Sequence, residues 1–284
     1  MTAFQKKIAS GALAKNGLLD NAAIEASTEL LSRIDGSGIE TVRVLFADQH
    51  GVLRGKTLVA SALASVFESG IAVPSTLLLK DTAHKTVFPV WSKDPGIEGD
   101  IAGAADVLLV PDPATFRELP WSPHSAWIFC DPVFKSGQII PFAPRVVLKN
   151  AIEKLTKAGL SMVTGLEVEF HVLEVSDPQL DPASSTMPPQ PPETQYLAQG
   201  YQFLTESRYA EMESVIDTLR RHCQALGLPL RSMEIEMGPS QLEFTFDPAD
   251  PLSHADNMIM FRTMVKEVCH SMGAACDLHV QTKA

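Results

Sequence analysis

Apolar side chains recur along this chain at two spacings, one typical of helices and one typical of strands. Helical spacing predicts helices over residues 19–34, 60–68, 145–158, 207–226 and 251–272. Gly36 and Gly227 follow two of them as stop signals, and Pro144 opens a third. Runs with strand character are predicted over residues 41–46, 52–58, 107–110, 126–130, 161–174, 229–237 and 241–246. This mixture of elements indicates an α+β fold.

The order of the elements predicts two domains. A small α+β domain is expected over residues 1–115, with a hairpin that turns at Asp48–Gly51. Residues 116–284 are expected to form a second domain, in which an antiparallel sheet is covered by helices. Residues 80–105 are loop-like without a clear pattern, and residues 176–192 contain six prolines, which predict a surface loop or a flexible excursion.

Composition narrows the class of protein. The chain has 284 residues, of which 45% are apolar and 20% charged, and it has no apolar run long enough to span a membrane. The four cysteines have no metal-site or redox spacing and the N-terminus has no secretory h-region, so a reduced cytoplasmic protein is expected. The net charge of −11 argues against nucleic acid as a partner. It also means that ATP would need metal ions or a local arginine cluster.

Two stretches place glutamates at strand spacing. Glu167 and Glu169 lie two residues apart within Gly165–Phe170, so they project from one face of a strand whose other face is apolar. A half-exposed strand is the ordinary explanation of such a segment taken alone.

A second stretch of glutamates favours a functional explanation over a half-exposed strand. Glu234 and Glu236 share a face of one predicted strand, and Gln241 and Glu243 share a face of the next. If the strands pair, several carboxylates meet, which raises their pKa values or recruits cations. Oxygen ligands of this kind suit Mg²⁺ or Mn²⁺. The alternative is that both segments present glutamates to water on unrelated faces.

Other motifs are weaker. The segment Gly51–Thr57 resembles a P-loop but is one residue short, and it continues as a strand rather than a helix. The histidines show no metal-site spacing. His171 shares a strand face with Glu169 and could line the same cleft, although a surface or hydrogen-bonded core histidine is the more ordinary interpretation. No catalytic residue can be assigned from the sequence.

The paired glutamate motifs resemble those of the glutamine synthetase family. Gly165–Phe170 is similar to the family's first metal-binding strand, and Glu236–Glu243 to its second. Val44–Gly51 is similar to the hairpin of the family's N-terminal β-grasp domain, and Asp106–Asp112 to the segment that joins the two domains. The resemblance covers about residues 40–273 and implies a β-grasp-like domain followed by the first part of a glutamine synthetase catalytic domain.

This resemblance implies an ATP-dependent ligase. Family members phosphorylate the γ-carboxylate of glutamate, and ammonia or an amine then displaces the phosphate. By the resemblance, Glu169, Glu236 and Glu243 would hold one Mg²⁺ or Mn²⁺ ion near glutamate, and Glu167 would hold a second near the ATP phosphates. A homo-oligomer is expected of the full-length protein, because family members assemble into stacked rings.

Three departures from the family pattern qualify this expectation. The family's further histidine, glutamate and arginine ligands would lie beyond Ala284. The tail Cys276–Ala284 does not follow the family pattern, and His279 within it has the wrong surroundings to replace that histidine. The chain is therefore expected to be truncated and inactive alone. Residues Phe67–Pro74 lack the F-D-G-S segment of ammonia-using members, which favours an amine substrate. The alternative is a non-catalytic binding or regulatory remnant that associates with full-length subunits.

Overall fold

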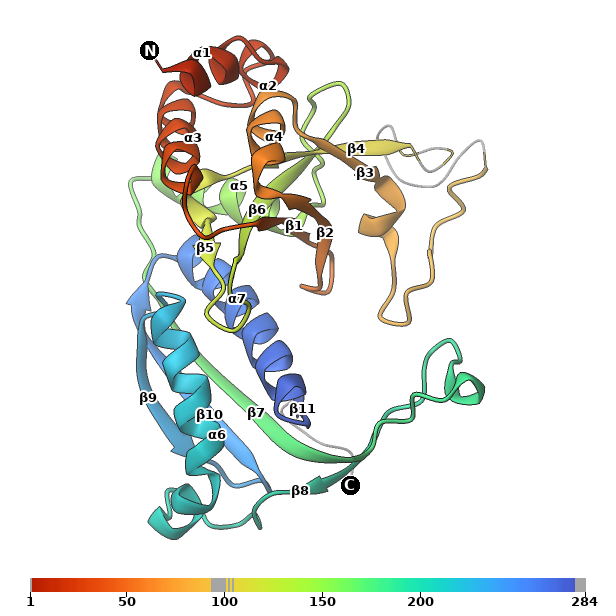
Figure 1. Cartoon of the computed structure of the whole chain (residues 1–284), viewed down its shortest axis with the longest axis vertical. Helices are drawn as coiled ribbons and strands as arrows, with labels where there is room; N and C mark the ends of the chain where they lie inside the picture. The colour runs from red at the N-terminus through yellow and green to blue at the C-terminus, as the bar shows by residue number, and fades with distance from the viewer. Residues whose placement is uncertain (1, 93–100, 102, 104, 279–284) are drawn as a thin grey trace. The chain divides into compact units, whose positions relative to one another are not determined.

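The computed structural model describes residues 2–92, 101, 103 and 105–278, and the chain separates into two compact units, Met1–Ala158 and Gly159–Ala284 (Figure 1). Both units combine helices with sheets, so the expected α+β class is confirmed. No helix among the described residues has the length and hydropathy needed to cross a membrane.

The first unit contains a six-stranded sheet in the order β2-β1-β6-β4-β3, with β5 paired to β6. Its strands are β1 (Thr41–Ala47), β2 (Leu53–Val59), β3 (Ile71–Pro74), β4 (Asp106–Pro111), β5 (Arg117–Glu118) and β6 (Ser125–Phe134). Its helices are α1 (Ala3–Ala9), α2 (Ala12–Lys15), α3 (Asn21–Ile34), α4 (Leu63–Ser69) and α5 (Pro144–Lys157), with 3₁₀ turns η1 (Ala60–Ala62), η2 (Ser75–Leu79) and η4 (Pro113–Thr115).

Strand β1 lies between β2 and β6 in this sheet. It pairs antiparallel with β2, as the predicted hairpin requires, and parallel with β6. Its alternate residues Val42, Val44 and Phe46 are buried, which gives the strand one apolar face against the helices. Whether this unit has the β-grasp topology stays a prediction.

Strand β6 is longer than the sequence predicts. It was expected to end before Asp131 and Pro132, but it continues to Phe134 and exchanges its parallel partner β1 for its antiparallel partner β4. The predicted domain boundary between residues 115 and 116 therefore falls inside one sheet, between β4 and β6. The two compact units divide instead between Ala158 and Gly159.

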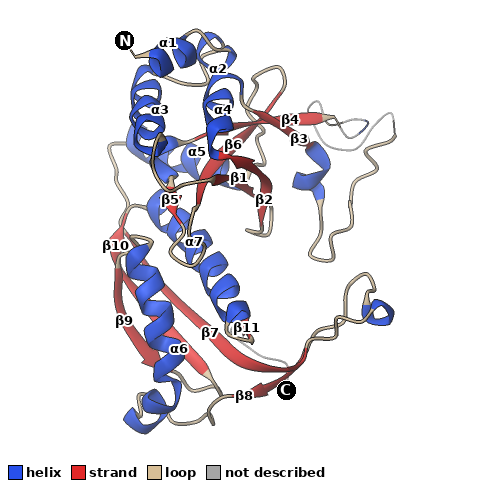
Figure 2. Ribbon diagram, viewed as in Figure 1, coloured by secondary structure: helices blue, strands red, loops and turns tan. Residues whose placement is uncertain are grey.

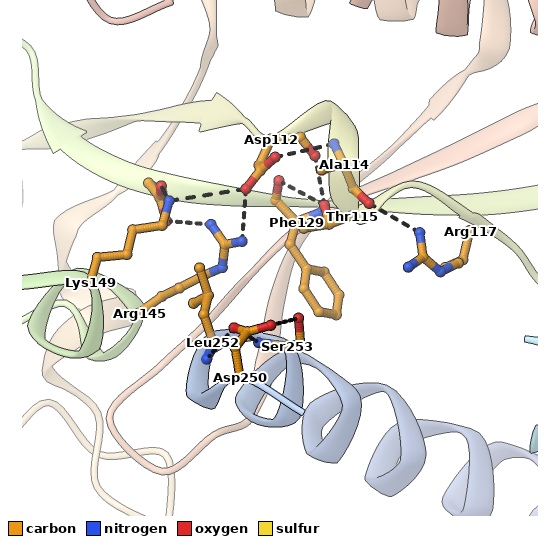
Figure 3. A network of polar contacts seen from close by, with 11 residues as sticks. Asp112, Ala114, Thr115, Arg117, Phe129, Arg145, Lys149, Asp250, Leu252 and Ser253 are labelled. Carbon is orange, nitrogen blue, oxygen red and sulfur yellow. Dashed lines mark hydrogen bonds and ion pairs between the residues drawn. The ribbon is translucent and has the colours of Figure 1, made fainter. Parts of the chain in front are cut away.

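A network of ion pairs ties α5 to this sheet. Arg145 donates to Asp112 over 2.7 Å and to Asp131 over 3.1 Å, and Lys149 donates to Asp131. Figure 3 shows the Asp112 carboxylate in contact with both the Arg145 and the Lys149 side chains. The Arg145 side chain is only 12% exposed, so its positive charge is stabilised mainly by the carboxylates of Asp112 and Asp131 rather than by water.

The second unit is built on an antiparallel sheet in the order β11-β7-β10-β9, with β8 paired to β7. Its strands are β7 (Thr164–Asp177), β8 (Glu193–Tyr196), β9 (Leu230–Ile235), β10 (Gln241–Ala249) and β11 (Ala274–Asp277), and a 3₁₀ turn η5 spans Pro182–Ser184. Helices α6 (Glu206–Ala225) and α7 (Pro251–Ser271) pack together on one side of the sheet (Figure 2). The predicted antiparallel sheet covered by helices is thus confirmed.

Aromatic side chains form the core between this sheet and α7. Phe170 of β7, Phe244 of β10 and Phe261 of α7 are fully buried, with ring centroids 5.4–5.5 Å apart. The Asp250 side chain caps α7 by accepting from the backbone N–H groups of Leu252 and Ser253, as Figure 3 shows. These contacts fix which face of β7 and β10 turns toward the helices.

Candidate metal site

The four glutamates predicted as metal ligands all belong to the second unit. Because Val168 and Phe170 are buried on the helix side of β7, Glu167 and Glu169 project from the opposite face. Glu243 projects from that same face of β10, since its neighbours along the strand are buried. The structure therefore brings the two separate glutamate stretches to one face of one sheet.

Strand pairing puts three carboxylates in a row across this face. Glu243 lies in register with Glu169 of β7 on one side and with Glu234 of β9 on the other. Like charges that oppose each other directly destabilise an antiparallel sheet. The row is therefore unfavourable unless a proton or a cation reduces its charge.

Two further carboxylates complete the cluster around Glu243. Glu236 follows the last residue of β9 and hydrogen-bonds to the Glu243 carboxyl. Partial burial, this hydrogen bond and the negative charges of Glu236, Glu234 and Glu167 together raise the pKa of Glu243 from 4.5 to about 7. Near neutral pH, the cluster thus retains a proton in the absence of a cation.

Gln241 positions one member of the cluster. Its amide nitrogen donates to Glu169 Oε2 over 2.8 Å, and its amide oxygen accepts from the backbone N–H of Gly238 over 2.7 Å. The absence of a side chain at Gly238 permits this contact, because a Cβ at this position would lie 2.5 Å from Gln241 Oε1 and 2.8 Å from His171 Nε2 and would displace them. The β9–β10 turn therefore orients Gln241, and Gln241 orients Glu169.

Ser240 anchors the same turn to the loop that precedes α6. Its hydroxyl oxygen accepts from the backbone N–H groups of Leu197 and Ala198, over 2.7 and 3.0 Å. Ser240 itself has a φ of 55°, a left-handed conformation that few residues other than glycine adopt. These contacts hold the turn in the shape that presents Gln241 and Glu236.

His171 shares the strand face of Glu169 but is a core residue. Its side chain is 2% exposed, and it lies in register with Gln241 on one side and Asp277 on the other. Burial lowers the pKa of His171, and the charge of Asp277 opposes that change. The second histidine weighed from the sequence, His279, lies outside the described residues.

The donor set suits a hard divalent cation. All members of the cluster are carboxylates, and oxygen ligands are those that Mg²⁺ and Mn²⁺ prefer. Within residues 2–92, 101, 103 and 105–278, no three His, Cys, Asp or Glu side chains converge on one point that could hold a metal ion. The glutamates are adjacent without converging, so metal binding would require their side chains to turn toward a common centre.

Two residues of the site were not assigned from the sequence. Glu234 was grouped with Glu236 but not predicted to act, although it stands directly opposite Glu243. Gln241 was placed on the face of Glu243, but its contact is with Glu169 on the neighbouring strand. The spacing of two residues identifies a shared face, whereas these partners follow from the register of β7, β10 and β9.

Comparison with known proteins finds similarity to glutamine synthetases and to a related γ-glutamyl ligase. Residues 141–281 match the family described as glutamine synthetase, catalytic domain. The γ-glutamylanilide synthase of Acinetobacter sp is 33% identical over 268 residues, which make up 92% of this chain and 54% of that protein. A glutamine synthetase of Methanosarcina mazei is 27% identical over 86% of this chain and 49% of its own length. The chain thus spans about half the length of these relatives.

A solved structure has the same fold. The structure described as apo GmaS without ligand superposes with a TM-score of 0.68 and 26% sequence identity, over 88% of this chain and 52% of the other. The match includes both units, because it covers more residues than either unit contains.

Proposed function

This chain is a member of the glutamine synthetase family, and from that premise we propose that it forms part of an ATP-dependent carbon–nitrogen ligase. The proposed reaction joins ammonia or an amine to the γ-carboxylate of glutamate through a γ-glutamyl phosphate. Glutamate, ATP and the nitrogen donor are the proposed small-molecule partners. We also propose that the full-length protein is a homo-oligomer, as the resemblance to the family implies, and that it is cytoplasmic.

The proposed role of this chain is to hold the divalent cations. Glu169, Glu236 and Glu243 would bind the ion near glutamate, and Glu167 the ion near the ATP phosphates. When bound, such ions neutralise the charge of the phosphoryl group in transfer and orient it in line with its acceptor. Gln241 keeps Glu169 at its place in the cluster through their hydrogen bond.

One observation carries this proposal. Glu243 lies among carboxylates of β7 and of the β9 segment, and its partial burial, its hydrogen bond with Glu236 and the neighbouring negative charges raise its pKa to about 7. Placing several like charges together has an electrostatic cost, and a divalent cation converts that repulsion into attraction.

The choice between ammonia and an amine rests on two observations. The chain is more similar to the γ-glutamylanilide synthase than to the Methanosarcina glutamine synthetase. Residues Phe67–Pro74, at the end of α4 and in β3, lack the F-D-G-S segment that the resemblance leads one to expect in ammonia-using members. We therefore propose an amine. A ligase assay of a complete enzyme that contains this chain, offered aromatic amines, alkylamines and ammonia, would overturn this choice if glutamine were the preferred product.

Metal binding gives the decisive test, because this chain spans only half of its relatives' length. Mn²⁺ titrated into the purified chain should bind in the micromolar to millimolar range, as the loss of the free-ion EPR signal reports. Glu243→Gln should weaken binding at least about tenfold, because a carboxylate ligand is lost. Glu174→Gln, an exposed position on the same strand β7, is the control and should bind as the unaltered chain does. Equal affinity of all three proteins would refute the proposed site.

A further inference from the structure

Two cysteines that are seven residues apart meet where α7 ends and β11 begins. The backbone N–H groups of Met272 and Gly273 donate to the carbonyls of Cys269 and His270, over 3.0 and 3.1 Å. Gly273, with a φ of 75°, then reverses the chain into β11, which pairs with β7. This reversal brings the thiols of Cys269 and Cys276 into hydrogen-bonding contact.

The two thiols differ in access. Cys269 is 0% exposed, whereas Cys276 is partly exposed. Cys276 lines a cavity of about 760 Å³ together with Lys266 and His270, and it also lines a second cavity of about 560 Å³. A small reagent can therefore reach Cys276 but not Cys269.

The two thiols also differ in acidity. The hydrogen bond from Cys269 and the positive charges of Lys266 and Arg262 lower the pKa of Cys276, against the effects of burial and Asp277. The same hydrogen bond and burial raise the pKa of Cys269. Since the thiolate is the nucleophilic form, Cys276 is the attacking sulfur and Cys269 keeps its proton.

We propose that Cys276 and Cys269 form a redox-active dithiol, which a peroxide oxidises to a disulfide that links α7 to β11. The Cys276 thiolate attacks one peroxide oxygen, the O–O bond breaks, and hydroxide leaves, so that Cys276 becomes a sulfenic acid. The Cys269 sulfur then attacks the Cys276 sulfur, the S–O bond breaks, and the oxygen departs as water with the Cys269 proton. Two electrons pass from the two sulfurs to the peroxide, which ends as one hydroxide and one water.

The other two cysteines provide an internal comparison. Cys130 and Cys223 are buried, and burial raises the pKa of both thiols, that of Cys223 to about 12. They should remain reduced under conditions that oxidise the pair, because thiolate content and access control the rate.

The test uses the whole chain treated with hydrogen peroxide, followed by alkylation of the remaining thiols and peptide mapping by mass spectrometry. Two of the four thiols should be lost, in a disulfide that links the peptides of Cys269 and Cys276. Cys269→Ser should leave a sulfenic acid on Cys276 that dimedone traps. Cys276→Ser should leave the Cys269 thiol reduced, and the control Cys223→Ser should behave like the unaltered chain.

One measurement needs no variant, so the proposal stays testable if a substitution prevents folding. In the unaltered chain, Cys276 should be alkylated at least about tenfold faster than Cys223, because it is both more accessible and more acidic. Equal rates for these two cysteines would overturn the proposal, as would a peroxide-treated chain that keeps four free thiols or that forms a disulfide between other cysteines. None of these readouts depends on metal binding or on ligase activity.

Discussion

Replacing Glu243 with glutamine should stabilise the metal-free protein and weaken its response to metal. In the absence of a cation, Glu243 shares its surroundings with Glu236, Glu234 and Glu167, and its pKa of about 7 exceeds its ordinary value of 4.5. Because the folded state holds the proton more tightly than the unfolded state, the folded state loses stability as pH rises from about 4.5 to about 7. Above about pH 7 this loss is complete.

The size of the effect follows from the difference between the two pKa values. Each pKa unit corresponds to about 1.4 kcal/mol, so the upper bound is about 3.4 kcal/mol. Glu243 is partly exposed, and solvent screening reduces this bound to about 1–2 kcal/mol. Glutamine has nearly the same shape, carries no charge and can still donate to Glu236. Glu243→Gln should therefore raise the free energy of unfolding by about 1–2 kcal/mol at about pH 8 and by much less at about pH 5.

The metal response should have the opposite sign. A ligand at about one hundred times its dissociation constant stabilises the folded state by about 2.7 kcal/mol. Mg²⁺ should therefore stabilise the unaltered chain at about pH 8, and Glu243→Gln should lose most of that gain. The variant is thus more stable than the parent in EDTA and less responsive in Mg²⁺.

The assay must report on the second unit. All three tryptophans, Trp91, Trp121 and Trp127, belong to the first unit, so tryptophan fluorescence does not report on unfolding of the second unit's sheet, which carries the glutamates. Hydrogen exchange of the β7 and β10 backbone amides, measured with and without Mg²⁺, follows it directly. The control Glu174→Gln should leave the exchange rates of these amides unchanged both with and without Mg²⁺. If Glu243→Gln speeds exchange in EDTA at about pH 8, or changes it equally at about pH 5, the proposed repulsion is refuted.

Three further substitutions test the structure around the site. Gly238→Ala should reduce Mg²⁺ affinity about tenfold with little change in far-UV circular dichroism, because its Cβ displaces Gln241; unchanged affinity would contradict this role. Arg145→Ala should cost about 1–3 kcal/mol in tryptophan-detected urea unfolding, since it leaves two carboxylates poorly compensated, whereas the exposed Lys157→Ala should cost almost nothing. Phe170→Ala should cost about 3–5 kcal/mol in exchange-detected stability of β10, and a loss under 1 kcal/mol would show that the aromatic core is misjudged.

Periodicity alone predicts the elements that carry their own signal. The helices α3, α5, α6 and α7 and the strands β1, β7 and β10 have long, regular apolar patterns, and the structure has each of them within a few residues of its predicted bounds. Strand β11 has no such pattern: its sequence, Ala274–Asp277, is extended because it pairs with β7. Its tertiary partner, rather than its own propensity, determines its conformation.

Proline misleads for a related physical reason. Asp131 and Pro132 predict the end of a strand, because proline cannot donate a backbone hydrogen bond. In the structure β6 continues through both residues, at the place where its pairing passes from β1 to β4. Pro132 lies in the part of β6 that pairs with β4, opposite Leu109, after the pairing with β1 has ended at Phe129, and no local pattern reveals where that change of partner occurs.

Register explains what the sequence could and could not say about the site. Spacing placed Glu167 with Glu169 and Gln241 with Glu243, because side chains two residues apart share a strand face in any sheet. It could not show that Glu169 and Glu234 flank Glu243, since a shift of one residue between strands would have turned every glutamate of one strand to the helix side. The aromatic core prevents that shift, because it would expose Phe170 or Phe244 to water. The aromatic side chains on the helix-packed face of the sheet thus fix the positions of the carboxylates on the opposite face, which is proposed to bind metal.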